Sequence, residues 1–350
     1  MRRWSVLLTP EQSAGGGMIM NSSWKVLVTG SEGFLGRYLV DNLVDAGFRV
    51  YRFDCREPAD QKKNAVSPFT RGDIRDKEAV DGAVAGMDAV VHAAAVLAQF
   101  QPDERIMRET NVGGTENVLA ASLHHGLKKF VFISSVEVYG PPPVIPCPED
   151  VPLEPICEYG RNKVEGEKLV LSYHSRGLPA VIFRPPTIAG PGQNEPFLLD
   201  QFKAVAAGGR VVIPGSGKVK LQMVDAGDAA EAVRLALNSS RGDGEVFNLG
   251  SKNVPTLRET IEALYRRTGR EPRLLCLPEG PVRAVVNLWA KFATPPISPQ
   301  HLDLAFRDSI YDIEKAARIL GWEPTCTDLE SNLETLDWYL EKVKDGREMK

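Results

Sequence analysis

The chain has 350 residues, of which 43% are hydrophobic and 25% charged, and its formal net charge is -4. These values are typical of a soluble globular protein with one large domain or two modest ones. The lack of a basic excess argues against a nucleic-acid partner, and no apolar run reaches the length of a membrane span, so we expect no membrane partner.

The cysteines and histidines follow no ligand or disulfide pattern. Five cysteines form an odd set without a CxxC pair, which favours free thiols in a reducing compartment and hence a cytoplasmic location. The five histidines show no HExxH spacing, so we expect no metal site.

Residues 1–22 are predicted to be a flexible N-terminal extension, because they include the run Gly15-Gly16-Gly17 and no periodic pattern. The apolar stretch behind Arg2 and Arg3 is too short for a signal peptide. Met18 and Met20 are alternative start positions.

A strand, a glycine-rich turn and a helix follow. Lys25–Thr29 is a buried-type strand, and it runs into Gly30, Gly33 and Gly36 at the start of a helix over Phe34–Ala46. Glycines in this context permit a tight turn, close approach of a pyrophosphate and close strand–helix packing. The segment therefore predicts a dinucleotide held at a helix N-terminus.

The next strand, Arg49–Phe53, ends at Asp54. A carboxylate there can accept hydrogen bonds from both adenosine ribose hydroxyls and would repel a 2′-phosphate, which favours NAD over NADP. Arg56 weakens this preference because an arginine can accommodate the phosphate. The alternative for Asp54 is a simple cap at the strand end.

The segment Gly72-Asp73-Ile74 follows a short strand at Phe69–Thr70. Asp73 can accept a hydrogen bond from the adenine amino group while Ile74 packs on the ring. The alternative is an Asx-type turn that starts a helix.

Strands and helices continue to alternate up to Arg184, which predicts a Rossmann-type, doubly wound parallel sheet over residues 23–184. The expected elements are helices at Lys77–Ala85, Asp103–His124 and Tyr159–Ser175, and strands at Asp88–His92, Lys129–Ser134 and Ala180–Phe183.

Residues 185–350 are expected to form a smaller, mostly helical substrate region, from which segments can return to the Rossmann domain. Helices are predicted at Phe197–Ala207, Asp228–Leu237, Thr256–Thr268, Val282–Phe292, Ile313–Leu320 and Leu329–Val343. We expect Trp289 and Phe292 of the apolar helix to be core residues; a substrate pocket or a dimer contact are the alternatives.

Tyr159 and Lys163 are four residues apart on a predicted helix and so share a face. A nearby ammonium lowers the pKa of a phenol, which can then exchange a proton with an alcohol while hydride moves to or from nicotinamide. Alone, this spacing also suits an ordinary surface pair. Ser135, at the end of a predicted strand, lies where ligands bind in parallel sheets.

The chain resembles the extended short-chain dehydrogenase/reductase family, in its NAD-dependent epimerase/dehydratase branch, from about Lys25 to Tyr339. The motifs that carry the resemblance are Thr29-Gly30-x-x-Gly33-x-x-Gly36, Gly72-Asp73-Ile74, His92-Ala93-Ala94-Ala95, Asn111-Val112-x-Gly114-Thr115, Ser134-Ser135-x-x-Val138-Tyr139-Gly140, Tyr159-x-x-x-Lys163, Arg184-Pro185-Pro186-x-Ile188-x-Gly190-Pro191 and Tyr311-Asp312-Ile313-x-Lys315-Ala316-x-x-x-Leu320-Gly321-Trp322-x-Pro324.

The resemblance implies that Ser135 orients the substrate oxygen, that Tyr159 is the general acid/base, and that Lys163 binds the nicotinamide ribose. It also implies a homodimer built on a four-helix contact. The remaining implied cofactor contacts come from Phe34 and Leu35 at the phosphates, Ala93 and Ala94 along the cofactor, Asn111 beneath it, and Pro186 beside the nicotinamide.

The loop after Ser135 bears on the reaction. Glu137 matches a glutamate of the family's sugar-nucleotide dehydratases and decarboxylases, where it is either an acid/base or a polar wall of the pocket. Val136 stands where 4,6-dehydratases have an aspartate, which disfavours a 4,6-dehydratase.

The substrate signal is mixed. Leu221 stands where sugar-nucleotide enzymes of the family carry a diphosphate-binding arginine, and Lys220 is a possible substitute, although a point charge rather than a bidentate fork. We expect hydride transfer at a secondary alcohol or ketone of a (nucleotide-)sugar. A 3β-hydroxysteroid or alcohol-type dehydrogenase is the alternative, and a non-catalytic NAD(P)-binding regulator is a minor one.

Overall fold

The computed structural model describes residues 23–58, 66–97, 100–289, 292 and 302–344. The extension predicted over residues 1–22 lies outside these ranges. Among the described helices, none is both long and apolar enough to cross a membrane.

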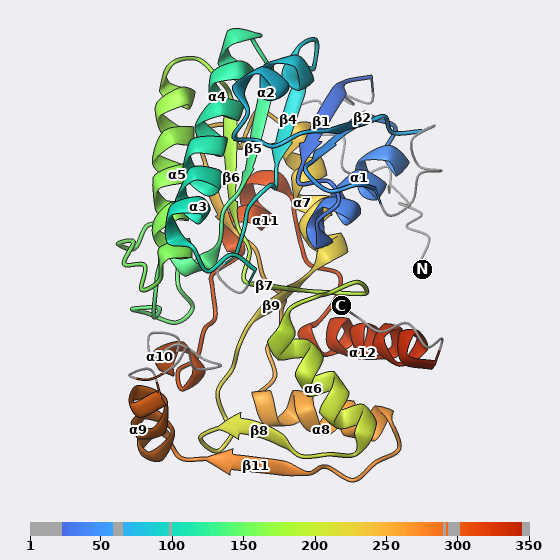
Figure 1. The fold of residues 1–350 in the computed structure, drawn as a ribbon, viewed down its shortest axis with the longest axis vertical. Coiled ribbons are helices and arrows are strands. Elements are labelled where there is room, and N and C mark those ends of the chain that lie inside the picture. Colours follow the sequence, from blue (N-terminus) through green and yellow to red (C-terminus); the bar gives the residue numbers. More distant parts are fainter. Residues whose placement is uncertain (1–22, 59–65, 98–99, 290–291, 293–301, 345–350) are drawn as a thin grey trace.

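A seven-stranded sheet forms the upper part of the molecule (Figure 1), and every pairing in it is parallel. Its spatial order is β10-β6-β5-β4-β1-β2-β3. The strand bounds are β1 Lys25–Thr29, β2 Arg49–Asp54, β3 Phe69–Arg71, β4 Ala89–His92, β5 Lys129–Ile133, β6 Ala180–Arg184 and β10 Val246–Asn248. The predicted Rossmann-type parallel sheet is confirmed.

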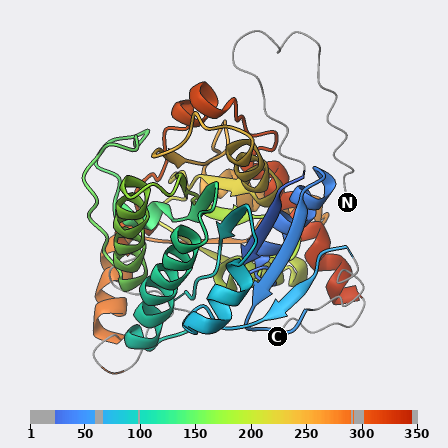
Figure 2. The same cartoon turned by 90° about the horizontal axis from the view of Figure 1, so that it is seen from above.

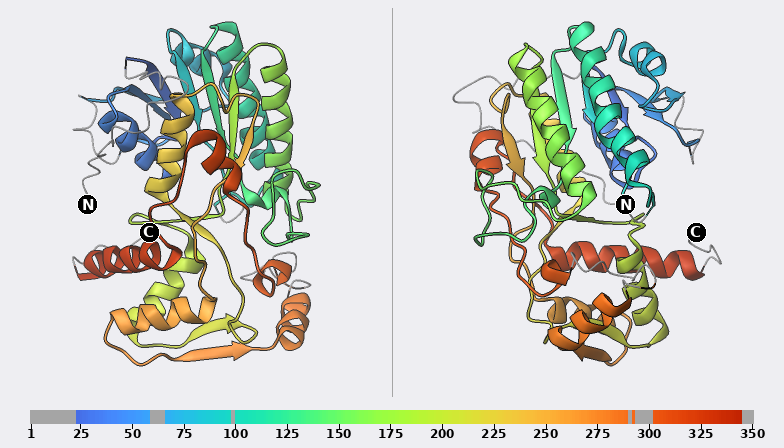
Figure 3. Two further views of the ribbon diagram at one scale, coloured as in Figure 1. Left: turned by 180° about the vertical axis from the view of Figure 1, so that it is seen from behind. Right: turned by 60° about the vertical axis from the view of Figure 1, so that its left-hand side comes forward.

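Helices cover both faces of this sheet, because its central strands are buried on both sides. One face carries α1 (Phe34–Asp45), α7 (Ala226–Leu237) and α11 (Glu314–Leu320), as the left panel of Figure 3 shows. The other carries α2 (Lys77–Val84), α4 (Thr115–His124) and α5 (Glu158–Ser175), and the last two lie side by side in Figure 2.

The helix predicted over Asp103–His124 is present but is not uniform. It consists of α3 (Glu104–Arg108), a π-helical segment η3 (Glu109–Gly114) and α4 (Thr115–His124). Wide π turns inside α-helices often lie at functional sites, and this one contains Asn111. Helix α5 spans Glu158–Ser175.

A small lobe lies below the sheet in Figure 1, with its own apolar core. Its elements are α6 (Pro196–Ala207), β8 (Val211–Pro214), α8 (Leu257–Arg267), β11 (Leu274–Leu277), α9 (Glu279–Trp289), α10 (Leu302–Ala305) and α12 (Asp328–Lys344). Strands β7 (Thr187–Ala189) and β9 (Met223–Asp225) pair in parallel at the junction.

Two expectations for the C-terminal half need correction. The described part of this half contains five strands that the pattern did not predict, because each is only three or four residues long and too short for a periodic signal. Trp289 and Phe292 are not core residues: they are 48% and 83% exposed, and the buried side chain of α9 is that of Val286.

Candidate active site

The glycine turn lies where the strand order reverses, between β1 and β4. Ligands bind at such switch points in open parallel sheets. Gly30 has a φ of 71°, and a Cβ there would come within 2.7 Å of the Ala94 backbone. Only glycine lets the turn after β1 come this close to the chain after β4.

The first turn of α1 is open to an anion. Its N-cap, Gly33, provides no side-chain hydrogen bond, and no acidic residue lies in the first turn. The helix N-terminus, including the predicted contact residues Phe34 and Leu35, therefore keeps its positive end available. A Cβ on Gly36 would come within 2.0 Å of the Gly30 carbonyl oxygen, so this glycine is needed for close packing.

Asp54 ends β2 beside this turn. It accepts a hydrogen bond from the Glu32 amide at 2.9 Å, and both carboxylate oxygens accept from the Arg56 guanidinium at 3.1 Å. Burial alone would raise the pKa of Asp54, but the hydrogen bonds from Arg56 outweigh it and hold that pKa below its usual value. The carboxylate is thus ionised at the place where an adenosine ribose is expected.

Asp73 and Ile74 follow β3 and differ in how exposed their side chains are. Asp73 is partly exposed and holds Arg75 in an ion pair of 2.6 Å. The Ile74 side chain is 4% exposed and packs in the core, where a Cβ on Gly114 would strike it. The predicted contact of this side chain with the adenine ring stays a prediction, and only a small part of the side chain is exposed to make it.

Asn111 holds the segment after β4 through two hydrogen bonds to Val96. Its side-chain amide donates to the Val96 carbonyl at 2.9 Å and accepts from the Val96 amide at 2.8 Å. Ala93 and Ala94, just before, are half-buried beside the glycine turn. The π-helical segment places Asn111 for this contact.

A buried histidine links the same elements. His92 Nε2 lies 2.9 Å from the Thr115 hydroxyl, which itself donates to the Asn111 carbonyl, so Nε2 carries the hydrogen. Nδ1 then accepts from Thr29 at 2.7 Å. Burial, aided by the charge of Lys163, lowers the pKa of His92 to about 3, so the ring is neutral.

Ser135 and Glu137 lie just beyond β5. The Ser135 hydroxyl oxygen accepts from the Glu137 amide at 3.2 Å and caps the short helix η4 (Val136–Val138). This contact leaves the hydroxyl hydrogen to donate to a ligand. The Glu137 carbonyl packs so tightly on α5 that only glycine fits at position 160.

Cys157 belongs to this group, although sequence reasoning missed it. Its thiol donates to Glu137 Oε2 at 2.8 Å, and its sulfur accepts from the Gly160 amide at 3.3 Å as the N-cap of α5. Burial, followed by the Glu137 charge, raises the pKa of this thiol to about 12. Its position two residues before Tyr159 at a helix start was the available signal.

Tyr159 and Lys163 lie one turn apart on α5, with the Lys163 nitrogen 5.6 Å from the tyrosine ring centre. The lysine donates to the Ile133 carbonyl at 2.7 Å, and burial lowers its pKa to about 8. The expected lowering of the phenol pKa is not found. Burial, then the charges of Glu137 and Cys157, raise the pKa of Tyr159.

A buried polar network supports the same strand ends. Arg184 and Glu167 form an ion pair at 2.6 Å, and Glu167 also accepts from Ser134 at 2.5 Å. Arg184 donates to the Tyr139 hydroxyl at 2.7 Å, which donates to Asn248 at 2.6 Å. These bonds tie β5, α5, β6 and β10 together.

The remaining predicted site residues lie further from this group or within the core. Val136 is 8% exposed in an apolar cluster, and Pro186 is buried after β6. Lys220 belongs to the small lobe, where its amide donates to Asp308 at 2.8 Å. Leu221 lines a cavity of about 30 Å³ there.

Fold and site together define a dinucleotide-binding protein of the Rossmann class. A family model described as the NAD dependent epimerase/dehydratase family matches residues 26–250, and the chain belongs to this family. The resemblance stated from the motifs is thereby confirmed.

Three comparisons illustrate the range of relatives. The chain is 30% identical to a dTDP-glucose 4,6-dehydratase of Streptomyces niveus, covering 90% of this chain and 92% of the relative. It is 28% identical to a Mycobacterium tuberculosis 3 beta-hydroxysteroid dehydrogenase/Delta 5-->4-isomerase, with 90% coverage of both. The Thermotoga maritima UDP-glucose 4-epimerase structure, containing UDP-glucose, matches with a TM-score of 0.77, 26% identity and coverage of 91% and 99%.

Proposed function

We propose that this chain is an NAD-dependent enzyme that transfers hydride at a secondary alcohol or ketone carbon of a sugar, with nucleotide sugars as the first candidates. The observation that carries the proposal is that Tyr159 and Lys163 lie one helical turn apart on α5, with the Lys163 ammonium bonded to Ile133 at the end of β5. The relatives named for sugar-nucleotide reactions support the substrate class.

The residues around the glycine turn fit the pyrophosphate and the adenosine ribose of NAD. The uncapped N-terminus of α1, with Phe34 and Leu35, would receive the pyrophosphate, and Asp54 the adenosine ribose. Ala93, Ala94 and Pro186 would line the cofactor further along. Bound nicotinamide would supply the acceptor and donor of hydride. The ionised Asp54 favours NAD over NADP because it would repel a 2′-phosphate.

In this mechanism, the Ser135 hydroxyl donates to the substrate oxygen, and the Tyr159 phenol exchanges the proton of that oxygen. The Lys163 ammonium, which donates to the Ile133 carbonyl, would hold the nicotinamide ribose and would stabilise negative charge on the phenol. The high phenol pKa of the chain alone means that the phenol is protonated before substrate arrives. It is therefore set up first as an acid, toward a ketone.

Glu137 is the proposed second acid/base or the polar wall of the substrate site. The Glu137 carboxylate accepts a hydrogen bond from the Cys157 thiol, and this bond orients the carboxylate. Val136 would contribute only backbone to the substrate, since its side chain is in the core.

The 3β-hydroxysteroid-type dehydrogenase is the second candidate, and one observation favours it. No arginine or lysine is among the described residues that line the small cavity beside Leu221, which are the apolar Phe197, Leu198, Met223, Pro255 and Leu257 and the polar Gln201, Thr260, Asp328 and Asn332. A relative of that name aligns with most of the chain.

A thermal-shift screen with NAD present separates the two candidates. UDP-, dTDP- and GDP-sugars are compared with sterols and simple ketones, and each stabilising compound is then assayed for hydride transfer by the absorbance of reduced nicotinamide. Stabilisation by a nucleotide sugar supports the proposal. Stabilisation by sterols alone would contradict the proposal and support a 3β-hydroxysteroid-type dehydrogenase instead.

We also propose a homodimer formed through α4 and α5. Both helices lie on the same face of the sheet, and Leu171 of α5 is 40% exposed there. Light scattering on a sizing column should give twice the chain mass, and Leu171→Asp should shift the protein toward monomer. A monomeric unsubstituted protein would overturn this proposal.

A further inference from the structure

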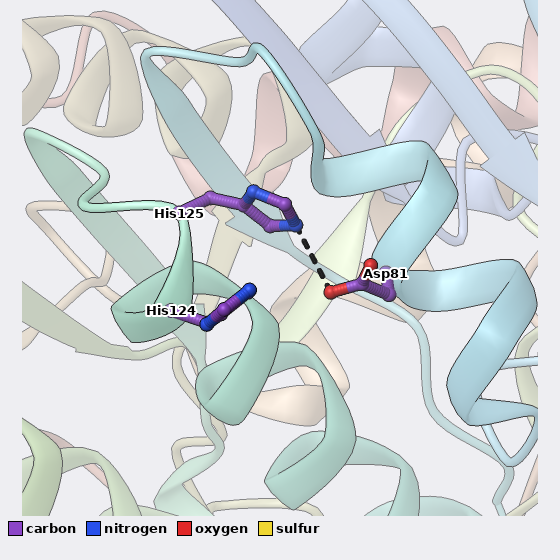
Figure 4. Close-up of side chains that lie close together, drawn as sticks. All are labelled: Asp81, His124 and His125. Atoms are coloured by element: carbon purple, nitrogen blue, oxygen red, sulfur yellow. Dashed lines mark hydrogen bonds and ion pairs between the residues drawn. The ribbon is translucent and has the colours of Figure 1, made fainter.

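Two histidines and an aspartate from different helices converge on the outer surface of the Rossmann domain. Figure 4 shows Asp81 of α2 facing His124 and His125 at the end of α4. The three residues offer one ligand atom each, and these atoms all lie within 4.8 Å of one another. We propose that they form a binding site for a zinc-class divalent cation.

The donor set suits such an ion. Two imidazole nitrogens and one carboxylate oxygen are ligands that Zn²⁺ binds at about 2.0–2.2 Å, and tetrahedral bonds of that length place the ligand atoms about 3.3 Å apart. His125 Nε2 and Asp81 Oδ1 are 2.9 Å apart. The other ligand atoms lie within 4.8 Å, so closing the site requires a contraction of at most about 1.5 Å between any two of them.

The hydrogen between His125 Nε2 and Asp81 Oδ1 occupies the position proposed for the metal. The Asp81 carboxylate can only accept, so His125 Nε2 donates the hydrogen of this bond. A cation bound at Nε2 would displace that hydrogen, and the neutral ring would then carry its single N–H on Nδ1. The His124 ring lies beside it, with the ring centres 4.9 Å apart at 69°.

The surroundings also favour a cation with open coordination positions. His124 ends α4 and His125 is its C-cap, where the helix presents the negative end of its dipole. Asp81 and His124 border a surface hollow of about 720 Å³, which leaves room for water on the metal. Three protein ligands with an open fourth position are typical of accessible zinc sites.

The site is separate from the proposed redox centre. Thr115, which contacts His92, begins α4, and His124 ends it, so about 15 Å of helix lies between them. Spacing along the sequence could not indicate this site, because Asp81 is brought to the two histidines only by the packing of α2 on α4.

Calorimetric titration with ZnCl₂ tests the inference on tag-free, EDTA-treated protein. The exposed thiols Cys55 and Cys276 are first replaced by serine, since they could bind zinc themselves. We expect one site per chain with a micromolar Kd. His124→Gln, His125→Gln and Asp81→Asn should each weaken binding by at least about 10-fold.

Glu116→Gln is the matched control, because Glu116 borders the same hollow outside the cluster; it should leave the Kd unchanged. Cobalt substituted for zinc should give visible d–d bands without a thiolate charge-transfer band. Absence of one-to-one binding, or binding that survives both histidine substitutions, would overturn the proposal, and circular dichroism would confirm that each variant is folded.

Discussion

The Lys163 ammonium donates to the Ile133 carbonyl oxygen at 2.7 Å, which fixes the lysine at the end of β5 beneath the proposed substrate site. Lys163 is only 4% exposed, so its charge is poorly solvated. The role proposed for Lys163 would therefore come at the expense of stability.

Replacing this lysine should stabilise the fold. Burial lowers the pKa of Lys163 from 10.5 to about 8, a difference equivalent to about 3 kcal/mol. The folded state therefore binds this proton less readily than the unfolded chain. The buried charge lowers the free energy of unfolding by its full amount below pH 8, and this loss shrinks between pH 8 and pH 10.5 and is absent above that range. Lys163→Met should raise the free energy of unfolding by about 1–3 kcal/mol at pH 7 and by less at pH 10.

Urea unfolding at the two pH values measures this difference. Lys168→Met, an exposed lysine on the same helix, is the control and should change little at either pH. If Lys163→Met destabilised the protein equally at both pH values, the burial argument would be wrong.

A second buried charge gives a pH effect of opposite sign in the acid range. Burial raises the pKa of Asp328 to about 6 from 3.8, and its Oδ2 has no hydrogen-bond partner. The folded state then holds a proton that the unfolded chain has lost, so stability falls as the pH rises from 3.8 to 6. The stability of Asp328→Asn relative to the unsubstituted protein should therefore rise by about 2 kcal/mol between pH 4 and pH 8.

The measurement is the free energy of unfolding against pH, with exposed Glu341→Gln on the same helix as the reference. A flat difference between the Asn variant and the parent across this range would contradict the assigned pKa.

The ion pair between Glu167 and Arg184 should be sensitive to loss of one partner. Both side chains are at most 5% exposed, so Glu167→Gln leaves a buried guanidinium uncompensated and should cost about 3–5 kcal/mol. Asp337→Asn breaks the exposed 2.7 Å pair with Arg267 and should cost less than about 1 kcal/mol. Equal effects in denaturant titrations would show that the buried network contributes no more than a surface pair.

Cofactor preference should depend on Asp54. Asp54→Asn removes the charge that opposes a 2′-phosphate and frees Arg56, which is now held at 3.1 Å. NAD affinity should fall about 10-fold, as expected for loss of a charged hydrogen bond, and NADP affinity should rise. Fluorescence titrations with both cofactors decide this, with Glu57→Gln, part of an exposed ion pair, as control. Tighter binding of NADP than NAD by the unsubstituted protein would refute the role given to Asp54.

Local patterns predicted much of the fold but little of its long-range contacts. The strand, glycine turn and helix at 25–46 follow from periodicity and chain geometry, as does the pairing of Tyr159 with Lys163 on one helix. The π-helical segment around Asn111, the short strand β10 and the thiol of Cys157 against Glu137 depend on packing between distant segments. The phenol pKa was predicted in the wrong direction because spacing shows a neighbouring ammonium but not the burial that opposes it.

The central claim is that Tyr159 exchanges the substrate proton, and Tyr159→Phe tests it most directly. Single-turnover hydride transfer is measured with the substrate identified in the screen, and Tyr51→Phe, a half-buried tyrosine on β2, serves as control. Tyr159→Phe should retain NAD binding but lose about 10²–10⁴-fold in the rate of hydride transfer. A Tyr159→Phe protein that transfers hydride at the full rate would contradict the account.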